Sequence, residues 1–105
     1  MEPLFVTLYP GPKEMVNAQL LNVHNDRWDV RLSGDIHRVE TLYATFWLDP
    51  APVNCHVRVI DTFEDPITGE LRASFFAIDL SPEERLRIMK NLRNAGAYVA
   101  LRNAS

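Results

Sequence analysis

The stretch FFAIDLSPEERLRIM, residues 75–89, contains the clearest structural signal in the chain, because a strand pattern changes within it into a helix pattern. The expected strand is apolar on both faces there, with Phe75 and Ala77 on one face and Phe76 and Ile78 on the other. A strand that is apolar on both faces needs cover on each side. We therefore expect one of these faces to line a barrel interior, and we expect the following helix to cover the other.

The helix signal begins at Ser81, which is a favourable N-cap residue. Pro82 suits the first helical position, and Glu84 completes a capping box with Ser81. Gly96 favours termination of the helix. Helical spacing predicts one apolar face that packs on the barrel, formed by Leu86, Met89 and Leu92 with Ile88 beside them.

Six segments of the chain have the composition or the period-two alternation of β-strands. Turn-forming residues separate them, including PGP at residues 10–12 and EDPITGE at residues 64–70. We expect strands at residues 4–9, 15–23, 28–32, 41–48, 53–63 and 71–80.

This order of elements predicts a mainly β fold, a six-stranded antiparallel barrel capped by one C-terminal α-helix. The length of 105 residues favours a single domain over residues 1–105. The pattern leaves open whether residues 1–14 close the barrel. It also leaves open whether AYVAL, residues 97–101, is an edge strand, an interaction segment or an ordered tail.

The composition excludes several classes of protein. Apolar residues make up 47% of the chain and charged residues 24%, which is typical of a folded globular domain. The net charge of -3 and the lack of a basic block argue against nucleic acid as a partner. The single cysteine, Cys55, indicates a reducing compartment. Because neither a signal peptide nor a long apolar run is visible, we expect a cytoplasmic protein without membrane insertion.

The sequence predicts neither a metal site nor catalysis. Cys55 and His56 are neighbours in an expected strand and point to opposite faces, so they do not converge on one ion. Cys55 is expected to be a small core residue, which makes its thiol unreactive. No spacing typical of zinc ligands, phosphate loops or catalytic serines is present. We therefore expect a non-enzymatic protein without a cofactor.

Residues 16–94 resemble a PilZ domain. The resemblance is carried by DRWDVRLSGDIHRVETLYATFWL (26–48), VNCHVRVIDTF (53–63) and LRASFFAIDLSPEERLRIMKNL (71–92). The last of these enters its helix through a pattern typical of the family, formed by Phe76, Leu80, Ser81, Glu83, Glu84, Arg85 and Leu92. The resemblance implies a six-stranded barrel with a C-terminal helix, and a role linked to the bacterial second messenger cyclic di-GMP.

The two ligand motifs of that family are degenerate in this sequence. An R-x-x-x-R motif is missing, because Lys13 is the only basic residue before Arg27. The D/N-x-S-x-x-G motif aligns with NVHNDR, so that Asn22 matches while His24 replaces serine and Arg27 replaces glycine. A bulky side chain at the glycine position hinders close approach of a ligand. The resemblance therefore implies weak or absent binding of cyclic di-GMP.

The first functional hypothesis is a PilZ-like adapter that contacts a signalling enzyme, a pilus or motility component, or a second copy of itself. Tyr43 and Trp47 could form an aromatic patch for a partner, although the helix or the first strand is expected to cover them. Arg85 and Arg87 lie on the expected outer face of the helix and could meet an acidic partner, although such residues are usually only solvated.

Two alternatives remain at this point. The protein could bind cyclic di-GMP at a non-standard site in which Arg27, Arg31 and Arg38 replace the missing arginine pair. It could also be an unrelated barrel that stacks single-stranded nucleic acid on Tyr43 and Trp47. The acidic net charge counts against the second alternative.

Overall fold

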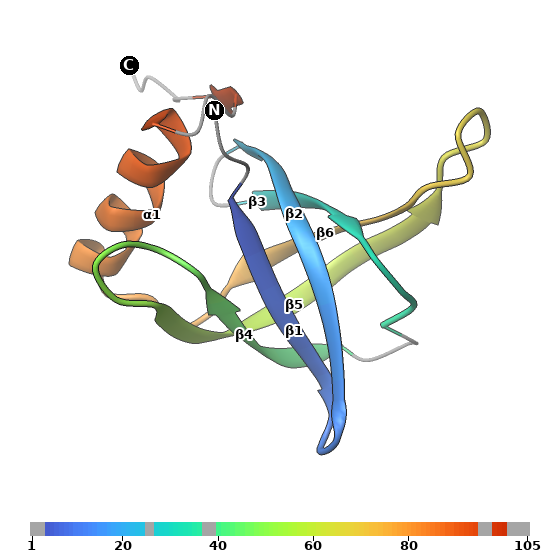
Figure 1. The fold of residues 1–105 in the computed structure, drawn as a ribbon, viewed down its shortest axis with the longest axis horizontal. Helices are drawn as coiled ribbons and strands as arrows, with labels where there is room; N and C mark the ends of the chain where they lie inside the picture. Colours follow the sequence, from blue (N-terminus) through green and yellow to red (C-terminus); the bar gives the residue numbers. More distant parts are fainter. Residues whose placement is uncertain (1–3, 25–26, 37–39, 95–97, 101–105) are drawn as a thin grey trace.

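The computed structural model describes residues 4–24, 27–36, 40–94 and 98–100 (Figure 1). Seven strands and one helix occur in this part of the chain. Their order is β1 (Phe5–Gly11), β2 (Glu14–His24), β3 (Arg27–Leu32), β4 (Thr41–Phe46), β5 (Val53–Glu64), β6 (Leu71–Ala77), α1 (Pro82–Asn94) and β7 (Tyr98–Ala100).

The first six strands form a closed antiparallel barrel in the order β1-β4-β5-β6-β3-β2, with β2 paired back to β1. This confirms the predicted fold class of a six-stranded barrel with a C-terminal helix. The N-terminal strand therefore closes the barrel, a point that the sequence left open. Within residues 97–101, Tyr98–Ala100 form a short parallel strand beside β2, and the rest lies outside the described residues.

The side chains that alternate toward one face of each strand form the barrel interior. Trp28 on β3 and Phe46 on β4 are both fully buried and meet edge to face, with ring centroids 5.4 Å apart. Cys55 lies in the same core, as expected. Burial raises the pKa of its thiol to about 12, and the carboxylates of Asp79 and Glu84 add to the shift. The Cys55 thiol is therefore protonated and inert at neutral pH.

The N-terminus of α1 has the predicted capping box. The Ser81 N–H donates to Glu84 Oε1 at 3.0 Å, and the Glu84 N–H donates to Ser81 Oγ at 3.1 Å. The predicted apolar face of the helix was wrong in part, because Leu86 is 70% exposed while Ile88 is fully buried in the core. Apolar residues at helical spacing defined two overlapping stripes, and packing against the barrel selected the one that contains Ile88.

The expectation that α1 covers the outer face of β6 was also wrong, since Phe76 and Ile78 are exposed. The connection between β6 and α1 is held against β5 instead. The Ile78 N–H donates to the His56 carbonyl at 2.8 Å, and the His56 N–H donates to Asp79 Oδ1 at 2.7 Å. This anchor leads the helix to one side of the barrel wall, where it lies in Figure 1.

Some element boundaries differ from the predicted ones. β1 continues through Pro10 to Gly11, because Gly11 still pairs with Glu14 after a register shift, so the turn is shorter than the expected PGP segment. β4 ends at Phe46 and β6 at Ala77, each before its predicted end. Trp47 and Leu48 nevertheless keep the alternation, with Trp47 exposed and Leu48 buried.

Candidate functional site

The outer surface of β3 and β6 carries charged side chains, and we call it the ionic face. In the strand register, Asp29 lies directly opposite Ser74, and Arg31 lies directly opposite Arg72. The ionic face consists of Arg27, Asp29, Arg31, Glu70, Arg72 and Ser74.

Ser74 links the two charged residues at one end of the ionic face. Its side chain is buried, and its hydroxyl donates to Asp29 Oδ1 at 2.6 Å. Arg27 Nη2 donates to the same hydroxyl at 3.2 Å, and Arg27 Nε lies 3.5 Å from Asp29 Oδ1. Arg27 is thus neutralised by a carboxylate on its own strand.

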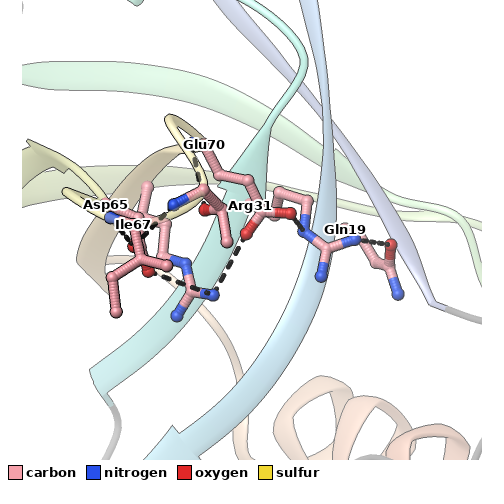
Figure 2. Close-up of polar contacts among 7 residues, drawn as sticks. Gln19, Arg31, Asp65, Ile67 and Glu70 are labelled. Atoms are coloured by element: carbon pink, nitrogen blue, oxygen red, sulfur yellow. Dashed lines mark hydrogen bonds and ion pairs between the residues drawn. The ribbon is translucent and has the colours of Figure 1, made fainter.

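Glu70 neutralises two arginines at the other end of the ionic face. Its two carboxylate oxygens lie 2.9 Å from Arg31 Nε and 3.1 Å from Arg72 Nη2. Figure 2 shows Arg31 between Glu70 and Gln19, whose Oε1 is 3.4 Å from Arg31 Nη1. Arg31 and Arg72 are like charges directly across two strands, which is unfavourable without a shared carboxylate. Glu70 supplies that carboxylate.

The turn that leads to Glu70 is itself ordered by an acid. Asp65 Oδ1 accepts the N–H groups of Ile67 at 2.8 Å and Thr68 at 3.1 Å (Figure 2). These hydrogen bonds lower the pKa of the Asp65 carboxyl below its ordinary value. Gly69 has a φ of 75°, which glycine adopts without strain. The predicted hairpin loop at residues 64–70 is therefore correct and fixes Glu70 beside the arginines.

A small pocket of about 130 Å³ opens on the ionic face. It brings together Asn22 and Arg27, two of the residues at degenerate ligand-motif positions. The side chain of His24 and all of Arg38 lie outside the described residues, so the structure does not place them. The pocket is lined by Leu21, Asn22, Arg27, Asp29, Val30, Phe63, Arg72, Ala73 and Ser74.

The outer surface of β1 and β4 has a different chemistry, and we call it the aromatic face. The strand register places Thr7 opposite Thr45 and Tyr9 opposite Tyr43. Beyond β4, the Trp47 N–H donates to the Phe5 carbonyl at 3.1 Å, which extends the same pairing by one step. The aromatic face consists of Phe5, Thr7, Tyr9, Tyr43, Thr45 and Trp47.

The aromatic rings of this face are open to solvent. Tyr43 is 41% exposed and Trp47 is 52% exposed, so the expectation that the helix or the first strand covers them was wrong. β1 lies beside β4 in the barrel wall and therefore pairs with its edge without covering its outer face. Tyr43 sits between Tyr9 and His56, with ring centroids 5.9 Å and 5.1 Å away.

The polar groups between these rings are already hydrogen-bonded. Trp47 Nε1 donates to Thr7 Oγ1 at 2.7 Å, and that hydroxyl donates to Asn17 Oδ1 at 3.1 Å. Thr45 Oγ1 donates to Asn54 Oδ1 at 2.7 Å. The bond to Thr7 ties the Trp47 side chain to β1 while the residue remains exposed. The aromatic face thus presents aromatic rings beside threonine and indole groups that are already hydrogen-bonded.

The helix residues Arg85 and Arg87 do not form the fully exposed pair that was expected, because both are half-buried. Arg87 Nη2 donates to the carbonyl of Ala51 in the β4–β5 connection. Lys90 is exposed. No group of three or more His, Cys, Asp or Glu side chains that could hold a metal ion occurs within the described ranges.

Sequence reasoning missed the pair formed by His56 and Asp79. His56 Nδ1 lies 2.9 Å from Asp79 Oδ2, and the His56 backbone N–H bonds the other carboxylate oxygen. Both interactions hold the pKa of the Asp79 carboxyl below its ordinary value. The two residues are 23 positions apart, and no local pattern reveals their contact before the strand register is known.

No protein-family model matches the chain, and no curated protein matches it in sequence. Among the described residues, none of the helical segments has the length and apolar character needed to cross a lipid bilayer.

Proposed function

We propose that this protein is a non-enzymatic, PilZ-like adapter of the bacterial cytoplasm that acts by protein–protein contact. Its setting is cyclic di-GMP-related signalling or the control of type IV pili and motility. The proposal combines the resemblance of residues 16–94 to PilZ domains with a closed barrel and C-terminal helix of the kind that resemblance implies. In this proposal the protein binds cyclic di-GMP weakly or not at all.

The observation that carries the proposal is the internal pairing of the ionic face. Arg27 and Arg31 each lie within 3.5 Å of a carboxylate oxygen of this chain. A phosphate would have to displace those carboxylates. The free energy lost from the existing ion pairs would then offset the free energy gained from the new ones. The pocket beside Asn22 is about 130 Å³, whereas small-molecule sites usually occupy roughly 300–1,000 Å³. Both facts support an adapter rather than a nucleotide receptor.

The aromatic face supports contact with another protein. Aromatic side chains that are exposed and conformationally fixed are enriched at interaction hot spots, because their burial contributes much free energy at little entropic cost. Tyr43 and Trp47 are both exposed, and the Nε1 bond of Trp47 fixes its ring. We place the partner-binding surface of the adapter on this face.

Capture of partners from a bacterial lysate, followed by reconstitution with the purified partner, tests this proposal. We expect Tyr43→Ala and Trp47→Ala to weaken the reconstituted complex at least about tenfold, as is typical of hot-spot residues. Arg31→Gln is the matched control, since it changes a partly exposed residue of the ionic face and leaves the aromatic face intact.

Two results would contradict the proposal. One is a partner whose affinity is unchanged by Tyr43→Ala and Trp47→Ala but is lost with Arg31→Gln, which would move the binding surface to the ionic face. The other is micromolar binding of cyclic di-GMP, which would favour the alternative of a receptor with a non-standard site that includes Arg27 and Arg31.

A further inference from the structure

The hairpin that joins β5 to β6 extends beyond the part of the barrel wall that β4 covers. The ladder between β4 and β5 ends at Thr41 and Arg58, and one further bond joins the Val59 N–H to the Glu40 carbonyl. Beyond that bond, no described strand pairs with this side of β5. We call residues 60–70 the arm, and Figure 1 shows it projecting from the barrel on the side opposite α1.

The arm combines exposed apolar side chains with a single sign of charge. Ile67 at its turn is 91% exposed, and Ile60 and Phe63 are also exposed. Residues 60–70 contain four acids and no base. Asp65 and Glu70 are held by the contacts described above, whereas the carboxylates of Asp61 and Glu64 have no ion pair or hydrogen bond within the described part of the chain.

The outer side of α1 has the complementary composition. The helix contains four bases and two acids over residues 82–94. Leu86 is 70% exposed near the middle of this side, and Lys90 follows it by one helical turn. Arg87 lies next to Leu86 in sequence and is half-buried, and its Nη2 donates to the Ala51 carbonyl. On α1, the exposed Leu86 thus lies beside basic residues. On the arm, the exposed Ile67 and Phe63 lie beside acidic residues.

One molecule cannot bring these two surfaces together, because the arm and α1 project from opposite sides of the barrel in Figure 1. Two copies related by a two-fold axis can bring the surfaces together, because antiparallel copies place each arm beside the helix of the other copy. Such an interface is closed and contains the same contact twice, as in most homodimers. The two acidic arms also stay apart in this arrangement, which avoids repulsion between like charges.

We propose that the arm of one copy docks on the outer side of α1 of a second copy, which forms a reciprocal two-fold dimer. Ile67 and Phe63 pack on Leu86, while Asp61 and Glu64 face Lys90 and Arg87. The occupant follows from charge complementarity between the arm and the outer side of α1. The inference uses surfaces separate from the aromatic face, so its failure leaves the adapter proposal untouched.

Sedimentation velocity of the full chain tests the dimer over a range of about 5 to 500 µM, at ~50 mM and at roughly 500 mM salt. We expect association of the wild type with rising concentration at low salt, and an association constant weakened several-fold at high salt because exposed charges are then screened. The final species is expected to have twice the mass of the chain rather than a ladder of larger masses.

Charge exchange identifies the contact. Asp61→Lys with Glu64→Lys makes the arm basic, and Arg87→Glu with Lys90→Glu makes the helix acidic. We expect each double variant alone to associate at least about tenfold more weakly than the wild type, and an equimolar mixture of the two to recover association. Recovery arises because each mixed contact again joins opposite charges.

Two further variants test the apolar part and provide a control. We expect Ile67→Ser to weaken the dimer, and Met15→Ser to leave it unchanged although Met15 is also exposed. Thermal unfolding of each variant shows whether it remains folded before association is compared. A wild type that is monomeric at about 500 µM and ~50 mM salt would overturn the inference. So would a dimer that the charge variants leave intact or that the mixture does not recover.

Discussion

The ionic face and the aromatic face are two outer surfaces of the same barrel wall, and they use their exposed groups in opposite ways. On the ionic face, Arg27 and Arg31 each face a carboxylate of this chain, so little charge is left for a ligand. On the aromatic face, Thr7 and Trp47 Nε1 are hydrogen-bonded to each other while the rings of Tyr43 and Trp47 remain open. The difference indicates that free energy for binding is available from apolar surface rather than from charge.

A core contact lies between the strands that carry the two faces, and its removal is expected to have the largest effect on stability. Trp28 lies behind the ionic face and contacts Phe46, which lies behind the aromatic face. We predict that Trp28→Ala lowers the free energy of unfolding by about 3–5 kcal/mol, because it leaves a large cavity. Urea denaturation measures this change.

The exposed tryptophan provides the matched control for that prediction. Trp47→Ala is expected to lower the free energy of unfolding by about 1 kcal/mol or less, because its ring is half in water and only one neutral hydrogen bond is lost. Equal losses for Trp28→Ala and Trp47→Ala would contradict the assignment of an inner and an outer tryptophan.

The next effect concerns the buried hydroxyl of the ionic face. Asp29→Ala is predicted to lower the free energy of unfolding by about 1–3 kcal/mol, because the buried Ser74 hydroxyl loses its acceptor. Asp61 is the matched control, since it lies opposite Ser74 on the other neighbouring strand but makes no bond to it. We expect Asp61→Ala to change stability by less than about 0.5 kcal/mol. A similar cost for both variants would show that the Asp29 bond is not specific.

A smaller effect is expected at the solvent-exposed end of the ionic face. Arg31→Gln removes the ion pair with Glu70. It is predicted to lower the free energy of unfolding by about 0–1 kcal/mol, since both side chains are partly exposed. Glu70→Gln is predicted to cost more than Arg31→Gln, because it leaves Arg31 and Arg72 facing each other without a shared carboxylate. Chemical denaturation at low salt distinguishes the two variants, and the opposite order would contradict the shared role of Glu70.

The smallest effect concerns the anchor between β5 and the start of α1. The pKa of Asp79 is lowered in the folded protein, chiefly by the His56 side chain. A lowered folded pKa contributes stability that is fully present above the ordinary value of 3.8 and is lost as the pH falls through the folded value. We predict that Asp79→Asn loses less stability than the wild type between pH 5 and pH 2, as measured by denaturation at each pH. An identical acid dependence for both proteins would exclude this contribution.

Much of the fold could be predicted from the sequence, because period-two alternation fixes which side chains face a barrel core. Cys55 was expected to be a core residue and is buried together with Val57, which lies on the same face of β5. The helix start was equally predictable, since Ser81 and Glu84 satisfy each other locally. The buried helix face was not, because Leu86 and Ile88 lie on overlapping stripes and only the path of the chain around His56 and Asp79 decides between them.

The candidate site was less predictable, for a related physical reason. Sequence reasoning grouped Tyr43 and Trp47 in one possible aromatic patch but expected other elements to cover them. Their actual neighbours depend on which strands pair and in which register. Glu70 neutralises Arg31 across 39 positions of sequence, and Thr7 bonds Trp47 across 40. Such pairings are invisible until β1 is known to lie beside β4 and β6 beside β3.

Calorimetric titration of the full chain with cyclic di-GMP at moderate salt tests the central claim most directly. The account predicts no measurable binding at a ligand concentration near ~100 µM, which corresponds to roughly −5 kcal/mol. Wild-type binding in the low micromolar range, lost with Arg27→Gln or Arg31→Gln, would contradict it, because arginines that are internally paired would then have exchanged their carboxylates for phosphate.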